Sequence, residues 1–300
     1  MSNRTDIYTR VTDRIVEALE RGVRPWVQPW ASQSTRRVSR PLRHNGVPYR
    51  GVNVLLLWAE AADRGFSSPY WLTFRQALEL KGHLRKGETG SVVVYSKQFT
   101  KTALDEAGEE VEEARSILRS YVVFNVDQID GLPAEYYPKA MECNNSVQRI
   151  QAADDFFTHT GAVIVQGGDT ACYVPSLDRI HIPRIESFKD AESFYSTLAH
   201  ESTHWTMHPS RLDRSFGSQR WGDEGYAVEE LVADCGAAFL CADLNLNCEP
   251  REDHAPYLAH WLKVLKGDRH AIFSAASHAQ RACDFLHGLQ PEGQEKETPA

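Results

Sequence analysis

The segment HESTHWTMHPSRLDR, residues 200–214, opens with two histidines four positions apart and a glutamate directly after the first. Residues four apart on a helix share one face, so His200 and His204 can direct imidazole nitrogens at a single ion. Glu201 lies about 100° further round such a helix, where a carboxylate reaches a water beside the ion rather than the ion itself. The spacing therefore predicts two metal ligands and one catalytic base, Glu201, for hydrolysis of a peptide bond.

A catalytic zinc site usually has three protein ligands and keeps one position open for water. His208 and Asp213 follow closely in the sequence. A ligand from either residue would have to bend around the ion, and Pro209 interrupts the chain at this point. We therefore expect the third ligand to come from another element.

The stretch EELVAD supplies that ligand best, because it places Glu230 26 residues beyond His204 on the next long helix. Asp234, one turn later, can accept the second N–H of a ligating histidine and hold its ring. This arrangement resembles the Glu-xxx-Asp helix of the gluzincin metallopeptidases. Glu229 remains the alternative ligand, since the helix register is not fixed by sequence. Tyr226 is a candidate oxyanion stabiliser, with packing as the alternative. Zinc is the expected metal, and another divalent ion such as Mn²⁺ is the alternative.

Hydrophobic periodicity predicts the elements that must position these residues. Helices are expected at 5–22, 52–65, from about 73, and at 148–161, 191–208, 226–244, 254–268 and 271–289. Strands are expected at 91–99, 117–126, 162–166, 171–175 and 179–183. The acidic stretch 101–116 is expected to be a long solvated loop between paired strands. The strand region 171–183 could offer an edge to an extended peptide.

This pattern predicts an α+β fold with two domains. Periodicity is lost between about 131 and 147, so we expect an N-terminal domain at 1–135 and a C-terminal zincin-like domain at 145–288. Residues 289–300 are polar and are predicted to be a disordered tail. The chain has no run of eighteen apolar residues, and its start lacks the apolar core of a signal peptide. A cytoplasmic protein without a membrane partner is therefore expected.

Charge divides the chain into two parts. Residues 1–101 hold 17 Lys and Arg against 8 Asp and Glu, a net charge of +9, whereas the remainder holds 16 against 33, a net charge of −17. Aromatic side chains alternate with the basic ones in the first part, as they do in grooves that hold single-stranded nucleic acid. The candidate contacts are Arg24, Trp26, Trp30, Arg36, Arg37, Arg40, Arg43, Arg50, Arg85 and Lys86.

Longer stretches of the chain resemble one family. The ArdC antirestriction proteins of conjugative plasmids, which are related to the N-terminal region of TraC-type primases, are similar in PWVQPW, YRGVNVLLLW, WLTFRQALELKGHLRKGETGSVVVY, FNVDQIDGLP, HESTHWTMHPSRLDR and YAVEELVADCGAAFL. The resemblance implies an N-terminal domain that binds single-stranded DNA and a C-terminal zincin-like metallopeptidase domain. It also implies protection of incoming plasmid DNA from host restriction during conjugation.

Single-stranded DNA, bound without sequence preference, is thus the expected partner. Double-stranded DNA and subunits of a host restriction-modification system are further candidates. One alternative is a DNA-masking protein without proteolytic activity, whose metal site is structural or vestigial. The other is a DNA-associated protease that acts on DNA-bound or crosslinked proteins. Replacing the base Glu201 separates the proteolytic readings from the masking one.

Overall fold

The computed structural model describes residues 6–26, 39–104, 110–137, 146–217, 224–246 and 255–291. Its helices are α1 Ile7–Glu20, α2 Val52–Arg64, α3 Phe74–Glu79, α4 Ser146–His159, α5 Ala191–Trp205, α6 Glu224–Asp243, α7 Ala255–Gly267 and α8 Ala271–Gly288. Its strands are β1 Leu42–Arg43, β2 Tyr70–Leu72, β3 His83–Leu84, β4 Ser91–Leu104, β5 Glu110–Asn125, β6 Ile129–Asp130, β7 Val163–Gln166, β8 Cys172–Val174 and β9 Arg179–Ile182. The fold is α+β, as the sequence predicts.

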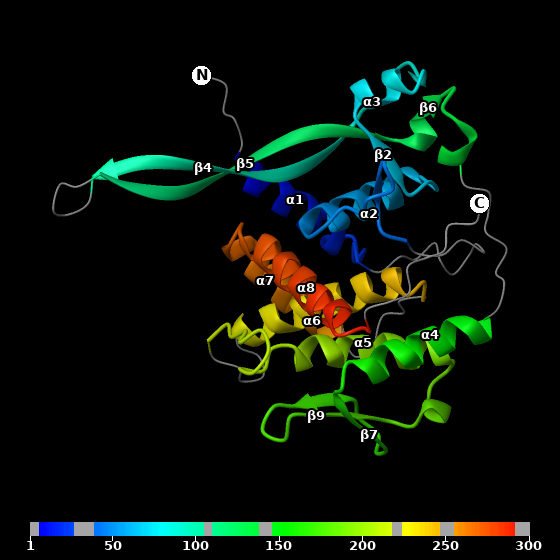
Figure 1. Ribbon diagram of the computed structural model, residues 1–300, viewed down its shortest axis with the longest axis vertical. Helices are drawn as coiled ribbons and strands as arrows, with labels where there is room; N and C mark the ends of the chain where they lie inside the picture. The colour runs from blue at the N-terminus through cyan, green and yellow to red at the C-terminus, as the bar shows by residue number, and fades with distance from the viewer. Residues whose placement is uncertain are drawn as a thin grey trace.

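The N-terminal half is built on a four-stranded sheet in the order β1-β2-β5-β4. Strands β1 and β2 are parallel, while β5 runs antiparallel to both β2 and β4. Helices α1 and α2 lie beside the sheet, and the β4–β5 hairpin projects from the molecule as a long arm (Figure 1). A second small core, which contains Leu72 and Ile129, packs beneath α3 and the pair of β3 and β6.

The prediction of a long solvated loop at 101–116 is wrong. Strand pairing continues to Leu104 opposite Glu110, so most of the acidic stretch belongs to the arm. Between the pair of Ser91 and Val123 and the pair of Leu104 and Glu110, each residue of β4 lies opposite one residue of β5. The backbone hydrogen bonds of such a ladder form whatever the side chains carry, which explains why acidic composition was a poor guide to a loop here.

The C-terminal half is a group of helices with a three-stranded sheet beside it (Figure 1). Helix α6 lies among α5, α7 and α8 and contacts all three. It is buried over almost its whole length from Ala227 onward, as expected of a largely apolar helix, and its buried residues include Glu229, Glu230 and Asp234. The small sheet has the order β7-β9-β8, in which β7 is parallel and β8 antiparallel to β9. Helix α5 contacts β8 and β9, and this contact brings the sheet edge to the predicted motif.

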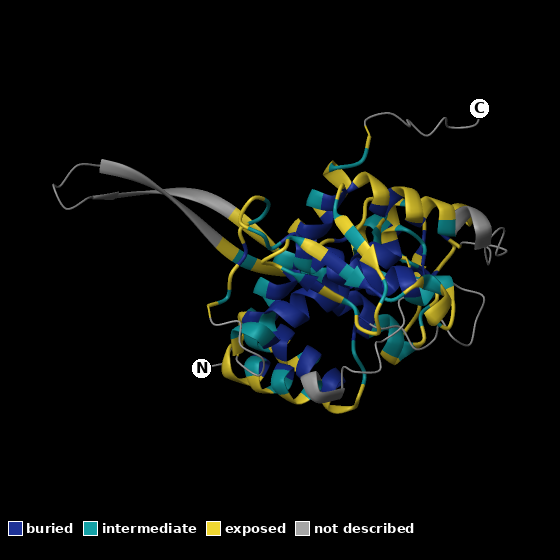
Figure 2. Ribbon diagram, turned by 90° about the horizontal axis from the view of Figure 1, so that it is seen from below, coloured by how far each residue is buried: buried dark blue, intermediate teal, exposed yellow. Residues whose placement is uncertain are grey.

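The two halves share one hydrophobic core. Its buried members include Ile15 and Leu55 from the first half and Phe239 and Ile272 from the second. Helix α1 packs on α7 and α2 on α8, and buried positions gather where the helices meet (Figure 2). The expected domain boundary falls between η3, Ala134–Tyr136, and the start of α4. Among the described helices, none combines the length and apolar character needed to span a bilayer.

Candidate metal centre

Helices α5 and α6 carry the predicted metal-site residues and approach each other closely. Asp190 caps the start of α5, because its carboxylate accepts a hydrogen bond of 2.7 Å from the Ser193 N–H. At the crossing, a Cβ added to Gly236 would lie only 2.6 Å from the Thr203 side chain. Glycine thus allows α6 to lie against the segment of α5 between the two histidines.

Three predicted ligands meet between these helices. The Nε2 atoms of His200 and His204 are 3.1 Å apart. Carboxylate oxygens of Glu230 lie 3.5 Å from each of them. Of the described residues, these three form the group whose potential ligand atoms all lie within 4.8 Å of one another. The His200 side chain is 3% exposed, and those of His204 and Glu230 are 12% and 10% exposed.

The hydrogen bonds of the two Nδ1 atoms determine which ring nitrogen of each histidine can bind a metal ion. The Nδ1 of His200 lies 3.1 Å from Asp234, and the Nδ1 of His204 lies 3.1 Å from Glu229. Because a carboxylate accepts a hydrogen bond, each Nδ1 must carry the proton in the neutral ring, which leaves a lone pair on each Nε2. Two lone pairs and a carboxylate then face one another in a buried space. The donor set therefore fits a divalent cation of the zinc or manganese type.

The pKa values of the two histidines also indicate that the site favours a positive charge. Burial disfavours a charged ring, but hydrogen bonds to Asp234 and Glu230 outweigh burial and raise the pKa of His200 to about 9. Burial is likewise outweighed by the charge of Glu230 and the hydrogen bond to Glu229, which raise the pKa of His204 to about 10. The carboxylates thus create a strongly negative environment at the ring nitrogens, and a bound cation would occupy it.

The structure separates the two glutamates that the sequence left as alternatives. Glu230 joins the ligand group, whereas Glu229 lies behind His204 and accepts two hydrogen bonds from Arg214, at 2.7 and 2.8 Å. Sequence reasoning missed Arg214. It is 3% exposed and also bonds to the Thr206 hydroxyl and the Thr203 carbonyl at the end of α5. A buried arginine bonded in this way fixes the carboxylate that orients His204.

Glu201 is buried on α5 and meets the edge of the small sheet. Its Oε2 accepts a hydrogen bond of 2.8 Å from the backbone N–H of Tyr173 on β8. Arg211 holds that strand in place, because its guanidinium donates to the Tyr173 hydroxyl and to Asp178 and lies 3.8 Å over the ring of Trp205. The predicted base and the predicted peptide-binding edge therefore lie side by side.

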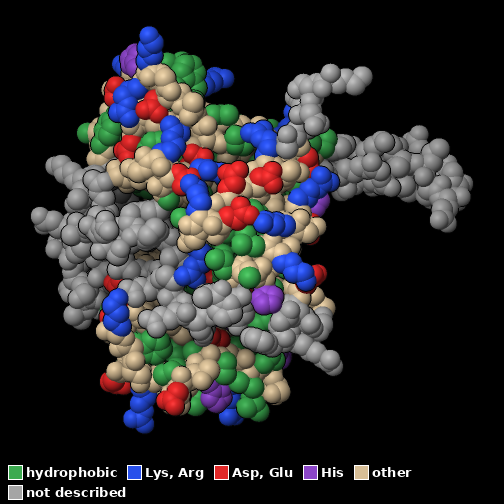
Figure 3. Space-filling view, turned by 180° about the vertical axis from the view of Figure 1, so that it is seen from behind, with side chains coloured by type: hydrophobic (Ala, Val, Ile, Leu, Met, Phe, Trp, Pro, Cys, Tyr) green, Lys and Arg blue, Asp and Glu red, His purple; other side chains and the backbone are tan. Residues whose placement is uncertain are grey.

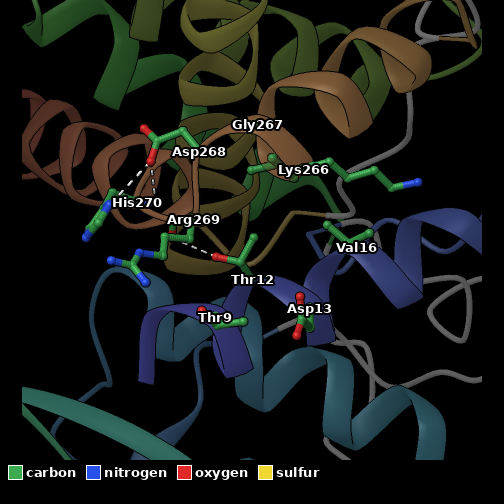
Figure 4. A pocket seen from close by; sticks show the side chains of 10 residues that line it. Thr9, Thr12, Asp13, Val16, Lys266, Gly267, Asp268, Arg269 and His270 are labelled. Atoms are coloured by element: carbon green, nitrogen blue, oxygen red, sulfur yellow. Dashed lines mark hydrogen bonds and ion pairs between the residues drawn. The ribbon is translucent and has the colours of Figure 1, made fainter. Parts of the chain in front are cut away.

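Tyr226 is half-buried on the first turn of α6, one turn before Glu230, and its role as an oxyanion stabiliser stays a prediction. A cleft of about 530 Å³ lies elsewhere, between α1 and the turn from α7 to α8, where Thr12 donates to the Arg269 carbonyl (Figure 4). None of the metal-site residues lines this cleft, so it plays no part in the chemistry above.

Comparison with known proteins decides the family. Residues 5–124 match the N-terminal domain of the anti-restriction factor ArdC, and residues 151–278 match a zincin-like metallopeptidase domain. The crystal structure of the metal-free antirestriction protein ArdC from plasmid R388 is 44% identical, with a TM-score of 0.78, and the match covers 95% of this chain and 97% of that one. The chain belongs to the ArdC family of antirestriction proteins.

Further relatives agree with this assignment. The Mn(II)-bound structure of R388 ArdC is 42% identical, with a TM-score of 0.76, covering 96% of this chain and all of that one. The uncharacterized protein y4eC of Sinorhizobium fredii is 40% identical over 98% of this chain and 95% of its own length. The DNA primase TraC of Escherichia coli is 34% identical over 97% of this chain, which spans only 28% of the primase.

Two of the predicted DNA contacts of this ArdC-family chain are buried, and those predictions are wrong for this structure. Trp26 is 2% exposed and packs edge-on against Trp261, so its ring cannot stack on a base. Arg40 is 6% exposed and forms a two-pronged ion pair with Asp243 on α6. Both residues join the N-terminal half to the C-terminal half.

The remaining DNA candidates have varied placements. Arg50 is exposed but pairs with Asp284 of α8, and Arg85 is exposed and pairs with Glu88. Trp30, Arg36 and Arg37 lie outside the described residues. Arg43 and Lys86 are exposed, and Arg24 is half-buried. Figure 3 shows one face of the molecule, on which basic and acidic side chains alternate without a patch of one sign. Part of the basic surplus of the first half therefore neutralises acids of the second.

Proposed function

We propose that this ArdC-family protein binds single-stranded DNA through its N-terminal half and hydrolyses peptide bonds at a divalent-metal site in its zincin-like half. Together these activities would protect incoming plasmid DNA from restriction in the recipient. The observation that carries the enzymatic part is the convergence of two Nε2 lone pairs and the Glu230 carboxylate in a buried space. The R388 relative has been crystallised with Mn(II), which supports a divalent ion at this place.

In this proposal His200, His204 and Glu230 would hold the ion, zinc or manganese. A divalent cation there supplies Lewis acidity, which lowers the pKa of a water and polarises a carbonyl. Glu201 would accept the proton of the attacking water and deliver it to the leaving amine. Its hydrogen bond from the Tyr173 N–H orients the carboxylate for this transfer. Tyr226 remains the candidate that would stabilise the oxyanion.

An extended peptide is the substrate class that the site favours. Strand β8 is an edge strand of the described sheet, and its backbone at Tyr173 reaches the base. An added strand would pair with this edge and bring its carbonyl to the metal side of Glu201. Subunits of a restriction system near the incoming DNA are candidate substrates, as are proteins bound or crosslinked to DNA.

The arm offers a surface for single-stranded DNA. Tyr95 lies opposite Arg119, and Lys97 lies opposite Ile117, so all four side chains share one face of the hairpin. Tyr95 is 43% exposed and its ring contacts that of Tyr121, while Lys97 and Arg119 are exposed. Tyrosine rings set among basic side chains suit stacked bases and a phosphate backbone. This face adds to the predicted contacts that are described and not buried, which are Arg24, Arg43, Arg50, Arg85 and Lys86.

Metal analysis tests the enzymatic proposal. After dialysis against a fixed free zinc concentration, the wild-type chain should hold about one ion, and His204→Ala should hold none. Glu230→Gln should lose the ion as well, while Glu224→Gln, on the same helix and 74% exposed, should keep it. Glu201→Gln should keep the ion and lose hydrolysis of a casein substrate. Plasmid protection that survives Glu201→Gln would show that proteolysis is unnecessary and favour DNA masking.

DNA binding has its own test. We expect affinity for a fluorescent single-stranded oligonucleotide to fall steeply with salt. Each of Lys97→Ala and Arg119→Ala should reduce the slope of log affinity against log salt by about 0.7, the value for one phosphate contact on a single strand. Unchanged slopes in both variants would remove the arm from the interface.

A further inference from the structure

Trp26 reaches the metal centre from the N-terminal half of the chain. Its indole Nε1 lies 3.3 Å from Oδ2 of Asp234 and donates to it. The side chain is 2% exposed and packs edge-on against Trp261 of α7, with ring centroids 5.6 Å apart. Trp261 in turn donates to the Ala227 carbonyl of α6. Trp26 is therefore fixed between α6 and α7 and directed at a single carboxylate.

That carboxylate is the one that orients a proposed ligand. The Oδ1 of Asp234 accepts from Nδ1 of His200 at 3.1 Å, while Oδ2 accepts from Trp26. The other histidine has a matching arrangement, in which Arg214 donates to Glu229 and Glu229 accepts from His204. Each histidine is thus held by a carboxylate, and each carboxylate is held by a donor. For His200 that donor, Trp26, comes from the N-terminal half.

We propose that Trp26 is a positioning residue for the metal centre, which acts on His200 through Asp234 and makes metal affinity depend on the N-terminal half. This inference rests on the proposed metal site. The indole N–H donates to Oδ2 and so orients the side chain of Asp234, whose Oδ1 accepts from His200. Without this donor, Asp234 is held less firmly, and the hydrogen bond that sets the tautomer and ring direction of His200 is weakened.

The coupling runs in both directions. If the docked Trp26 raises the affinity for the metal, a bound metal must stabilise the docked position of Trp26 by the same free energy. The sequence directly after Trp26, VQPWASQSTRR, carries three of the predicted DNA contacts, Trp30, Arg36 and Arg37. Residue 26 therefore joins the metal centre to the part of the sequence in which DNA contacts are expected.

The test compares two buried tryptophans of the N-terminal half in the full-length chain. Trp26→Phe keeps an aromatic ring and removes the donor to Asp234. Trp58→Phe is the matched control, because Trp58 is 3% exposed and its indole donates to the Ser39 carbonyl rather than to a residue of the metal centre. Zinc and manganese affinities, measured by competition with a chelator, should fall about three- to tenfold in Trp26→Phe and stay unchanged in Trp58→Phe. Removing a direct partner of a metal ligand usually costs more, roughly 10–100-fold.

A double-mutant cycle shows whether Trp26 acts through Asp234. Asp234→Ala should lower metal affinity by roughly 10–100-fold. Adding Trp26→Phe to Asp234→Ala should then change affinity no further, because the shared partner is gone. The d–d absorption spectrum of the cobalt-substituted protein should shift in Trp26→Phe and not in Trp58→Phe, a response that a loss of packing alone does not produce.

Wild-type metal affinity in Trp26→Phe, or an undiminished effect in the Asp234→Ala background, would overturn the inference and leave the metal centre standing. A wild-type chain that binds no metal would overturn both. If Trp26→Phe does not fold, 3-benzothienylalanine at position 26 keeps the bicyclic shape and lacks the N–H. The same loss of affinity is expected from that replacement, and unchanged affinity refutes the role of the donor.

Discussion

Arg214→Met is the substitution that most severely tests the positioning of His204. The guanidinium donates four hydrogen bonds, at 2.7 and 2.8 Å to Glu229, 3.0 Å to the Thr206 hydroxyl and 2.9 Å to the Thr203 carbonyl. Burial opposes the charge of Glu229, but Arg214 and His204 keep its pKa below the usual range. Methionine fills much of the same space and leaves a buried carboxylate without its charged partner.

The expected loss is large. Removing one partner of a buried ion pair costs about 3–5 kcal/mol, so the metal-free protein should melt on the order of 10 °C lower. Metal affinity should fall by roughly 10–100-fold as well, because Glu229 no longer holds His204 in place. Differential scanning calorimetry and chelator competition measure the two effects. Arg75→Met is the control, since Arg75 is 89% exposed and its pair with Glu79 contributes no more than about 0.5 kcal/mol.

The double variant Arg214→Met with Glu229→Gln sharpens this prediction. It removes both charges and keeps an acceptor for the Nδ1–H of His204, so much of the lost stability should return. An Arg214→Met protein that melts within 1 °C of wild type and binds metal normally would refute the reasoning.

Three further variants test other parts of the structure. Gly236→Ala places a Cβ 2.6 Å from the Thr203 side chain, so it should destabilise the protein by about 1–3 kcal/mol. It should also weaken metal binding, because α5 is displaced. Chemical denaturation measures the first effect and chelator competition the second. Arg40→Gln should lower the melting temperature, because it breaks the buried pair with Asp243, and should leave the salt dependence of DNA binding unchanged. Burial and the nearby arginines lower the pKa of His278 to about 4, so the unfolded chain binds its proton more tightly and stability should fall as the pH drops from about 6.5 to 4. Melting curves of His278→Gln should show a weaker loss over that interval.

The metal site was accessible to sequence reasoning because most of it is local. Two histidines four apart define a helix face, and Asp234 follows Glu230 by one turn. The choice between Glu229 and Glu230 required the structure, because it depends on how α6 is rotated against α5. Arg214 was missed for a similar reason. Arg214 lies in the non-helical segment after α5, its carboxylate partner Glu229 lies on α6, and the spacing of 15 residues carries no periodic signal.

The DNA contacts were less predictable. Tryptophan and arginine are residue types common in nucleic-acid-binding surfaces. The partners of Trp26 and Arg40, however, are Asp234 and Asp243, which lie 208 and 203 residues further along the chain. Burial of a tryptophan or arginine depends on such distant partners, and neither charge counts nor local pattern contains that information. The acidic arm shows the converse case, since backbone pairing alone extended the strands through a polar sequence.

Anomalous X-ray scattering from crystals soaked in manganese or zinc salts tests the metal centre most directly. We expect one strong peak between the Nε2 atoms of His200 and His204 and the carboxylate of Glu230, with Glu229 and Asp234 outside ligand distance and facing the Nδ1 atoms. The absence of a peak there, or a peak bound by other side chains, would contradict the proposed site.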